Sequence, residues 1–279
     1  MPIVRIDRRG IFRAAAGALL ASTPVAALLQ GAGIAHAAPM PGTTEDFGSI
    51  KILAFDFQGS CMDYYQPIAG MGQEINKNKG LSLDWSILTK EWINHLYRAV
   101  AEHKDDYLPA AQLYRVALDR MLAQQQLSAT FSNEERDQIM GVWDRMAPWP
   151  DTAEGLSRLK RKFALTTLSN ASMASVFQSV RRHALPFDQV LTGELVRAYK
   201  PAPQVYNLVT SLLGYQTDEV LFCATHFSDL KEAKKFGYKT AWWPRPNETG
   251  PGQVTDTVPK PFVDIHARDI TDLAQQLGA

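Results

Sequence analysis

After about residue 50, the apolar positions of the chain follow two different spacings. Residues 51–57 are a short, mostly apolar run ending at a Gly-Ser pair, which is typical of a buried strand leading into a tight loop. Residues 64–148 instead repeat at helical spacing, and no convincing strand interrupts them. Two apolar stripes carry this repeat: Trp85, Leu88, Trp92, Leu96 and Val100, then Leu113, Val116, Ala117, Met121 and Leu122. Ser132 followed by Glu135 predicts a capped helix start within this segment.

From Pro148 onward, short apolar runs alternate with helical segments. Strands are expected at residues 163–168, 190–191, 220–224 and 240–243, and helices at 171–183, 201–213, 228–236 and 269–277. Strands that alternate with helices pair in parallel. The pattern therefore predicts an α/β fold, a doubly wound Rossmann-like sheet with an all-helical cap inserted after its first strand. The core domain would comprise residues 49–63 and 149–279, and the cap domain residues 64–148.

The first 37 residues have the layout of an export signal. Arg8 and Arg9 precede an apolar run from Ala14 to about Leu29, and small residues at Ala35 and Ala37 suit a signal peptidase. The arginine pair predicts a twin-arginine-type signal, cleavage near residue 38 and a periplasmic or secreted protein. An ordinary amphipathic helix and a retained membrane anchor are the alternatives. No membrane span is expected after cleavage.

Composition narrows the function classes only modestly. The 279 residues carry 29 basic and 29 acidic side chains, a formal net charge of zero, so nothing indicates nucleic acid as a partner. The hydrophobic share of 46% suits a globular core. Cys61 and Cys223 are expected to be free thiols, with a disulfide between them left open because an exported protein meets an oxidising compartment.

Polar side chains gather where the expected strands end. Asp56 to Ser60 follow the first strand, Ser169 and Asn170 the second, and His226 to Asp229 the fourth, while Lys200 precedes a helix. Ligands of such sheets bind at the carboxyl ends of the strands. Carboxylates, a hydroxyl, an amide and an ammonium converging there from four segments predict an active site.

These segments resemble the four motifs of the haloacid dehalogenase superfamily. Residues 55–63 look like its first motif, and Ser169-Asn170, Lys200-Pro201 and Asp229 follow in the order and spacing of the others. Leu168-Ser169-Asn170, the run Tyr199 to Tyr206 and Trp149-Pro150-Asp151 resemble the (S)-2-haloacid dehalogenases in particular. The resemblance covers essentially the whole mature chain.

The resemblance implies a role for each catalytic residue. Asp56 would displace halide from C2 of a short 2-halo acid and form an aspartyl ester, which water then hydrolyses to a 2-hydroxy acid. Lys200 would keep that carboxylate anionic. Ser60 would hold Asp56 by a hydrogen bond, and Asp229 would orient Lys200 or the hydrolytic water, with Tyr206 nearby.

The same resemblance implies where the substrate binds. Ser169 and the backbone N–H of Asn170 would receive the substrate carboxylate, and the Asn170 side chain would lie near the leaving halide. His226 is expected in the ligand shell or in packing, without a metal role. The partner would be a small anionic molecule, and a homodimer is expected by analogy alone.

Gln58 stands where phosphatases of the superfamily carry a second aspartate. A leaving alkoxide needs a proton from that acid, but a leaving halide does not. A hard cation would also find too few oxygen ligands among residues 226–229, so no metal and no cofactor are expected. Gln58 would instead face the substrate.

Ile93 is the departure that speaks against dehalogenation. The dehalogenases carry an arginine in the first cap helix, commonly after a tryptophan, that stabilises the departing halide, whereas Trp92 here precedes Ile93. Lys90 or Arg98 could substitute from another turn. The alternatives are therefore a phosphatase of this superfamily and a non-catalytic exported binding protein on the same fold.

Overall fold

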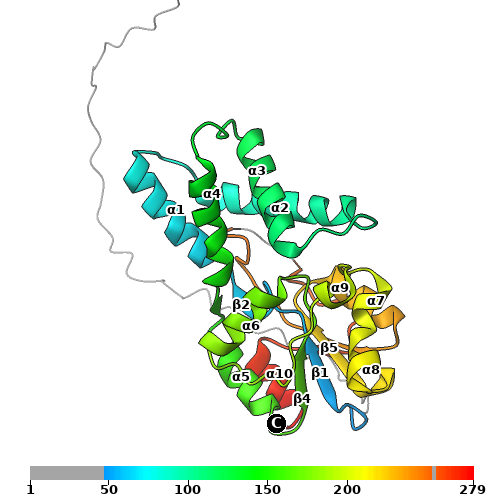
Figure 1. The fold of residues 1–279 in the computed structure, drawn as a ribbon. Helices are drawn as coiled ribbons and strands as arrows, with labels where there is room; N and C mark the ends of the chain where they lie inside the picture. Colours follow the sequence, from blue (N-terminus) through cyan, green and yellow to red (C-terminus); the bar gives the residue numbers. More distant parts are fainter. Residues whose placement is uncertain (1–46, 253–255) are drawn as a thin grey trace, which may run out of the picture. The chain divides into compact units, whose positions relative to one another are not determined.

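The computed structural model describes residues 47–252 and 256–279 (Figure 1). The predicted signal peptide lies outside the described residues. Five parallel strands form one sheet in the order β4-β1-β5-β6-β7. Their bounds are β1 Ile52–Phe55, β4 Ala164–Thr167, β5 Val220–Ala224, β6 Lys239–Trp242 and β7 Ile265–His266. No helix in the described part of the chain is long and apolar enough to cross a membrane.

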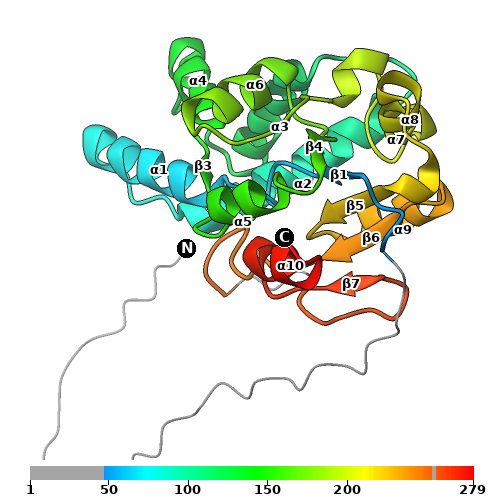
Figure 2. The ribbon, with the colours of Figure 1, turned by 90° about the horizontal axis from the view of Figure 1, so that it is seen from below.

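Alternate side chains of β1 enter two separate cores. Leu53 and Phe55 pack in a cluster with residues of helices α5 and α10, whereas Ile52 and Ala54 pack with those of α7, α8 and α9. The sheet is therefore covered on both faces, as Figure 2 shows for α5 and α10. This confirms the predicted α/β fold with a parallel sheet. The helices are α5 Thr152–Leu159, α6 Met173–Arg182, α7 Pro203–Tyr206, α8 Leu208–Leu213, α9 Phe227–Lys235 and α10 Ile270–Gln276.

Four helices form the insert that follows the first strand of the sheet. They are α1 Tyr65–Lys79, α2 Trp85–Glu102, α3 Ala110–Gln124 and α4 Asn133–Met140. Trp92 of α2 is fully buried and donates its indole N–H to the carbonyl of Tyr114 in α3. Helix α4 begins with the predicted capping box, in which Ser132 and Glu135 bond each other's backbone N–H. A two-stranded antiparallel ribbon, β2 Met62–Asp63 and β3 Ala147–Pro148, joins the two ends of the insert.

Two local predictions were wrong, and one short ribbon was missed. Residues 190–191 form no strand, because the Thr167 hydroxyl bonds both the N–H and the carbonyl of Leu191 and only isolated bridges remain. The helix expected over 201–213 is split at Asn207. There the Tyr206 carbonyl accepts a hydrogen bond from the Tyr238 hydroxyl. The ribbon β2–β3 was missed, since each of its strands has two residues.

Cys61 and Cys223 are both buried free thiols, as expected. Burial raises the pKa of both thiols well above the ordinary value, so neither is a thiolate at neutral pH. Both act as small apolar residues of the core.

Candidate active site

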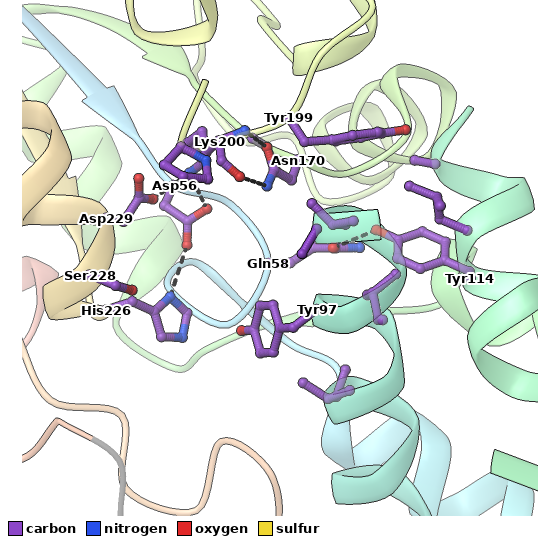
Figure 3. Close-up of a pocket in the computed structure, with 18 of the residues that line it drawn as sticks. Asp56, Gln58, Tyr97, Tyr114, Asn170, Tyr199, Lys200, His226, Ser228 and Asp229 are labelled. Atoms are coloured by element: carbon purple, nitrogen blue, oxygen red, sulfur yellow. Dashed lines mark hydrogen bonds and ion pairs between the residues drawn. The ribbon is translucent and has the colours of Figure 1, made fainter. Parts of the chain in front are cut away.

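The carboxyl ends of β4, β1 and β5 lie side by side and carry the predicted polar groups. Ser169 follows β4. Asp56 follows β1 and His226 follows β5, while Lys200 reaches in from the loop before α7 (Figure 3). The structure thus brings together the segments that the sequence predicted to form an active site. They border a cavity of about 1110 Å³ whose other wall is formed by α2 and α3.

Asp56 is held at the cavity by three side chains, and only 6% of its surface is exposed. Ser60 Oγ donates a hydrogen bond of 2.7 Å to Oδ2, and Lys200 Nζ donates one of 2.9 Å to Oδ1. His226 Nδ1 lies 3.5 Å from Oδ2. Burial alone would raise the pKa of Asp56, but Lys200 and His226 outweigh it and hold that pKa well below the usual range. Asp56 is therefore an anion at any physiological pH.

Lys200 lies between two carboxylates. Its ammonium also donates to Asp229 Oδ2, while the Tyr206 hydroxyl donates to Asp229 Oδ1. Burial would lower the pKa of Lys200, but Asp229 and Asp56 together raise it above the ordinary value, so the ammonium stays charged. Asp229 orients Lys200, and Tyr206 orients Asp229.

The two polar residues after β4 have different contacts. The Asn170 amide donates to the Lys200 carbonyl at 3.1 Å and accepts from the Lys200 N–H at 2.6 Å, so it fixes the lysine loop. Ser169 Oγ accepts from the Ala171 N–H at 3.1 Å and also lines the cavity. The binding of a substrate carboxylate by Ser169 stays a prediction.

Gln58 connects the loop after β1 to the helical insert. Its Oε1 accepts a 2.6 Å hydrogen bond from the hydroxyl of Tyr114 in α3, and its amide nitrogen lies 3.7 Å from the Met146 sulfur. Burial raises the pKa of Tyr114, so that hydroxyl keeps its proton. Gln58 borders the cavity as predicted, but it is bonded to protein and helps to position α3.

Ile93 forms part of the cavity wall on the α2 side, with Leu96 and Val100. Of the two cations expected to replace the missing arginine, Lys90 borders the cavity and Arg98 is not among its lining residues. Lys90 is exposed. Within the described ranges, no three His, Cys, Asp or Glu side chains are grouped so that they could hold a metal ion.

Glu248 is a site residue that the sequence did not reveal. It lies in the loop after β6, is 3% exposed, and accepts a 3.1 Å hydrogen bond from the Tyr64 hydroxyl. His226 Nε2 lies 2.9 and 3.0 Å from its two oxygens. A single glutamate in a loop rich in proline and polar residues has no local signal, and Tyr64 lies 184 positions away.

Arg245 anchors this loop and was missed for the same reason. Its guanidinium binds Asp151 through two hydrogen bonds of 2.7 and 2.9 Å, and Nε donates to the Ser60 carbonyl at 3.0 Å. The loop that carries Glu248 is thereby tied to the loop that carries Ser60.

Arg245→Met should lower the free energy of unfolding by about 3 kcal/mol, because it leaves the poorly exposed Asp151 carboxylate without its cation. Urea denaturation followed by circular dichroism measures the change. Arg268→Met is the matched control, since its ion pair with Asp272 lies at the surface and should matter little. Equal effects from the two variants would contradict the anchoring role.

A haloacid dehalogenase-like hydrolase family model matches residues 50–237. The chain belongs to this family. The match includes all four segments that carry Asp56, Ser169, Lys200 and Asp229. The family expected from the motifs is thus confirmed.

Several relatives of this chain are named (S)-2-haloacid dehalogenases. One from Pseudomonas sp. (strain YL) is 28% identical over 200 residues, covering 69% of this chain and 82% of the relative. One from Pseudomonas putida is 29% identical over 124 residues, covering 43% of this chain and 55% of the relative. This match thus spans only about half of the Pseudomonas putida relative.

Two solved structures are similar over most of the chain. One is an L-2-haloacid dehalogenase with 33% identity and a TM-score of 0.76, covering 82% of this chain and 99% of that one. The other is a defluorinating L-2-haloacid dehalogenase with 29% identity and a TM-score of 0.77, covering 82% and 96%.

Proposed function

We propose that this protein is a hydrolytic dehalogenase of short 2-halo carboxylic acids that works through an aspartyl ester. One observation carries the proposal: Asp56 is a buried anion, held by Lys200 and Ser60, at the wall of a cavity. A carboxylate fixed in this way is a nucleophile for carbon. The named activities of the relatives support the same chemistry.

The first step is displacement at C2. An Asp56 oxygen attacks, the carbon–halogen bond breaks with its electron pair, and halide leaves. Lys200 keeps the attacking carboxylate ionised, and Ser60 and Lys200 fix its two oxygens. Ser169 and the backbone N–H of Asn170 would receive the substrate carboxylate. Water then cleaves the ester at Asp56 Cγ and releases the 2-hydroxy acid.

The phosphatase alternative has less support in the geometry. The group two residues after the nucleophile is Gln58, which carries no ionisable proton and is bonded to Tyr114. The Lys200 ammonium lies between Asp56 and Asp229, where it neutralises both carboxylates. These contacts favour a departing halide, which needs no proton, over a departing alkoxide.

The test is bromide release from racemic 2-bromopropionate by residues 38–279 in EDTA. We expect multiple turnovers of one enantiomer, because a walled site that fixes the carboxylate and C2 presents one face to Asp56. Release of p-nitrophenol from its phosphate ester with Mg²⁺, together with no bromide, would favour the phosphatase. Carboxylate binding without turnover would favour the non-catalytic alternative.

We also propose that the protein is exported and that it forms a homodimer. The arginine pair and apolar run of residues 1–37 support a periplasmic or secreted protein. A homodimer rests on analogy with related enzymes. Fractionation of cells that express the full chain, and size-exclusion chromatography with light scattering on the mature protein, test the two points.

A further inference from the structure

A carboxylate–imidazole pair stands beside the nucleophile and has no part in the chemistry described so far. His226 Nε2 lies 2.9 and 3.0 Å from the Glu248 oxygens, and its other nitrogen, Nδ1, faces Asp56 Oδ2 at 3.5 Å. Nucleophile, imidazole and orienting carboxylate thus stand in series (Figure 3 shows the first two). This is the arrangement by which an imidazole is made a general base.

We propose that His226, oriented by Glu248, is the general base that activates the water hydrolysing the Asp56 ester. The proposal rests on the aspartyl-ester function proposed above and adds the residue that completes its second step. A base must lie within reach of the attacking water, directly or through one hydrogen bond. Nδ1 lies 3.5 Å from Asp56 Oδ2, which places the imidazole beside the carboxyl group that water attacks in the ester.

Glu248 is built into the fold for this contact. It is 3% exposed, and the Tyr64 hydroxyl donates to the oxygen Oε1 that also faces His226. A second anchor comes from Arg245 in the same loop, which binds Asp151 and the Ser60 carbonyl. The imidazole ring is therefore held in one orientation with Nδ1 toward Asp56.

Gly59 leaves the room that the pair needs. Its φ is +81°, a conformation that favours glycine, and a Cβ built there would lie 2.0 Å from Glu248 Oε1. The same Cβ would lie 3.2 Å from His226 Cε1. The loop after β1 thus accommodates the histidine and the glutamate as well as the nucleophile.

Asp229 is worse placed for the same task. Each of its oxygens already accepts a hydrogen bond, one from Lys200 and one from Tyr206. The Lys200 ammonium also lies between Asp229 and Asp56. Both oxygens of Asp229 are thus occupied by donors, whereas the imidazole nitrogen Nδ1 faces the nucleophile itself.

The charge of the imidazole follows the catalytic cycle. Its charged and titratable neighbours are Asp56 after β1, Glu248 after β6 and Tyr97 of α2. In the free enzyme, burial would lower the pKa of His226, but these neighbours raise it well above the ordinary value, so an imidazolium pairs with the Asp56 anion. Ester formation removes the negative charge of Asp56 and lowers that pKa when the base is needed.

The protons balance around the cycle. After halide leaves, the imidazolium releases its Nδ1 proton to solvent. Water then attacks Cγ and gives one proton to Nδ1, while the electron pair of the carbonyl moves to oxygen. The tetrahedral intermediate collapses, the bond to the substrate oxygen breaks, and the alkoxide takes the proton from Nδ1. Asp56 is left as a carboxylic acid and returns its proton to His226, restoring the ion pair.

The decisive experiment is bromide release by the His226→Gln variant, followed through the first turnover. We expect about one bromide per enzyme, then release slowed by at least about 100-fold. Acid-quenched samples should carry the substrate's 1-carboxyethyl group, as an ester, on the peptide that contains Asp56. In wild type the same label should stay at a low steady level.

Other outcomes separate this inference from the proposed function. Failure of the wild-type protein to release any bromide removes the dehalogenase itself. If wild type turns over, two results for His226→Gln would each contradict the role of His226: unimpaired turnover, or no release of a first bromide. In both cases the proposed dehalogenase function would still hold. Ester accumulating in Asp229→Asn but not in His226→Gln assigns the base to Asp229 instead.

Glu248→Gln supplies a second measurement should the histidine variant fail to fold. Glutamine keeps a hydrogen-bond acceptor but loses the negative charge that raises the pKa of His226. The pH at which ester hydrolysis reaches half its maximal rate should therefore move to lower pH. A purely structural role would reduce the rate without moving the profile, and that result would overturn the proposal.

Discussion

Asp56→Asn is expected to lose at least about 10⁴-fold in kcat for bromide release, with no ester formed on the protein. An amide oxygen carries no full negative charge and is a poor nucleophile for C2. The single oxygen of the asparagine can accept from Lys200, and its NH2 group can donate to Ser60 Oγ. Lys200 also keeps Asp229, so the variant should fold. Steady-state bromide release and mass spectrometry of the quenched protein measure the two effects.

Asp63→Asn is the matched control for this prediction. Asp63 ends the same loop but its side chain accepts a hydrogen bond from the Gln66 N–H, which an asparagine oxygen can also accept. Bromide release by this variant should be close to wild type. Residual turnover by Asp56→Asn within tenfold of wild type would show that another group attacks carbon.

The parallel strands were predictable where long apolar runs fix them. Strand β5, for example, has the bounds expected from the sequence, because its five residues are all buried and turn signals flank them. Short pairings were not predictable. Strands β2, β3 and β7 have two residues each, and tertiary contacts rather than periodicity determine them.

The candidate site also contains residues that were predictable from the sequence and residues that were not. Asp56, Ser169, Lys200 and His226 were predictable because each follows a strand or precedes a helix at the edge where parallel strands end. Glu248 and Arg245 were not, since they come from an irregular loop.

Glu248 and Arg245 are positioned by contacts with residues that are distant in the sequence. Arg245 meets Asp151 across 94 positions, and Glu248 meets Tyr64 across 184. A sequence pattern identifies residues at strand ends more readily than residues whose position depends on such long-range contacts.

Lys200→Met should reduce kcat/KM by about 10³-fold at neutral pH and the free energy of unfolding by about 4 kcal/mol. The substitution removes the ammonium that lies between Asp56 and Asp229 and leaves two poorly exposed carboxylates. Burial, with the negative charge of Asp56, already raises the pKa of Asp229; without Lys200 that pKa rises further, and the pKa of Asp56 rises with it. Part of the nucleophile is then protonated.

Between about pH 5 and 8 this variant should show a fall in stability with rising pH that Asp56 and Lys200 do not cause in wild type. In wild type the lowered pKa of Asp56 contributes stability above its unfolded value of about 3.9, which is lost as the pH falls through the folded value. The raised pKa of Lys200 contributes below about 10.4 and is lost as the pH rises through the folded value.

In Lys200→Met the folded carboxyls bind protons more tightly than the unfolded ones. The free energy of unfolding should therefore fall as the pH rises from about 5 to 8. Urea denaturation at these two pH values measures the slope, and Lys235→Met, which removes an exposed ammonium paired with Glu232, is the control expected to follow wild type. A Lys200→Met protein that is equally stable at both pH values would mean that the carboxylates remain solvated, and that Lys200 does not set the ionisation of the nucleophile.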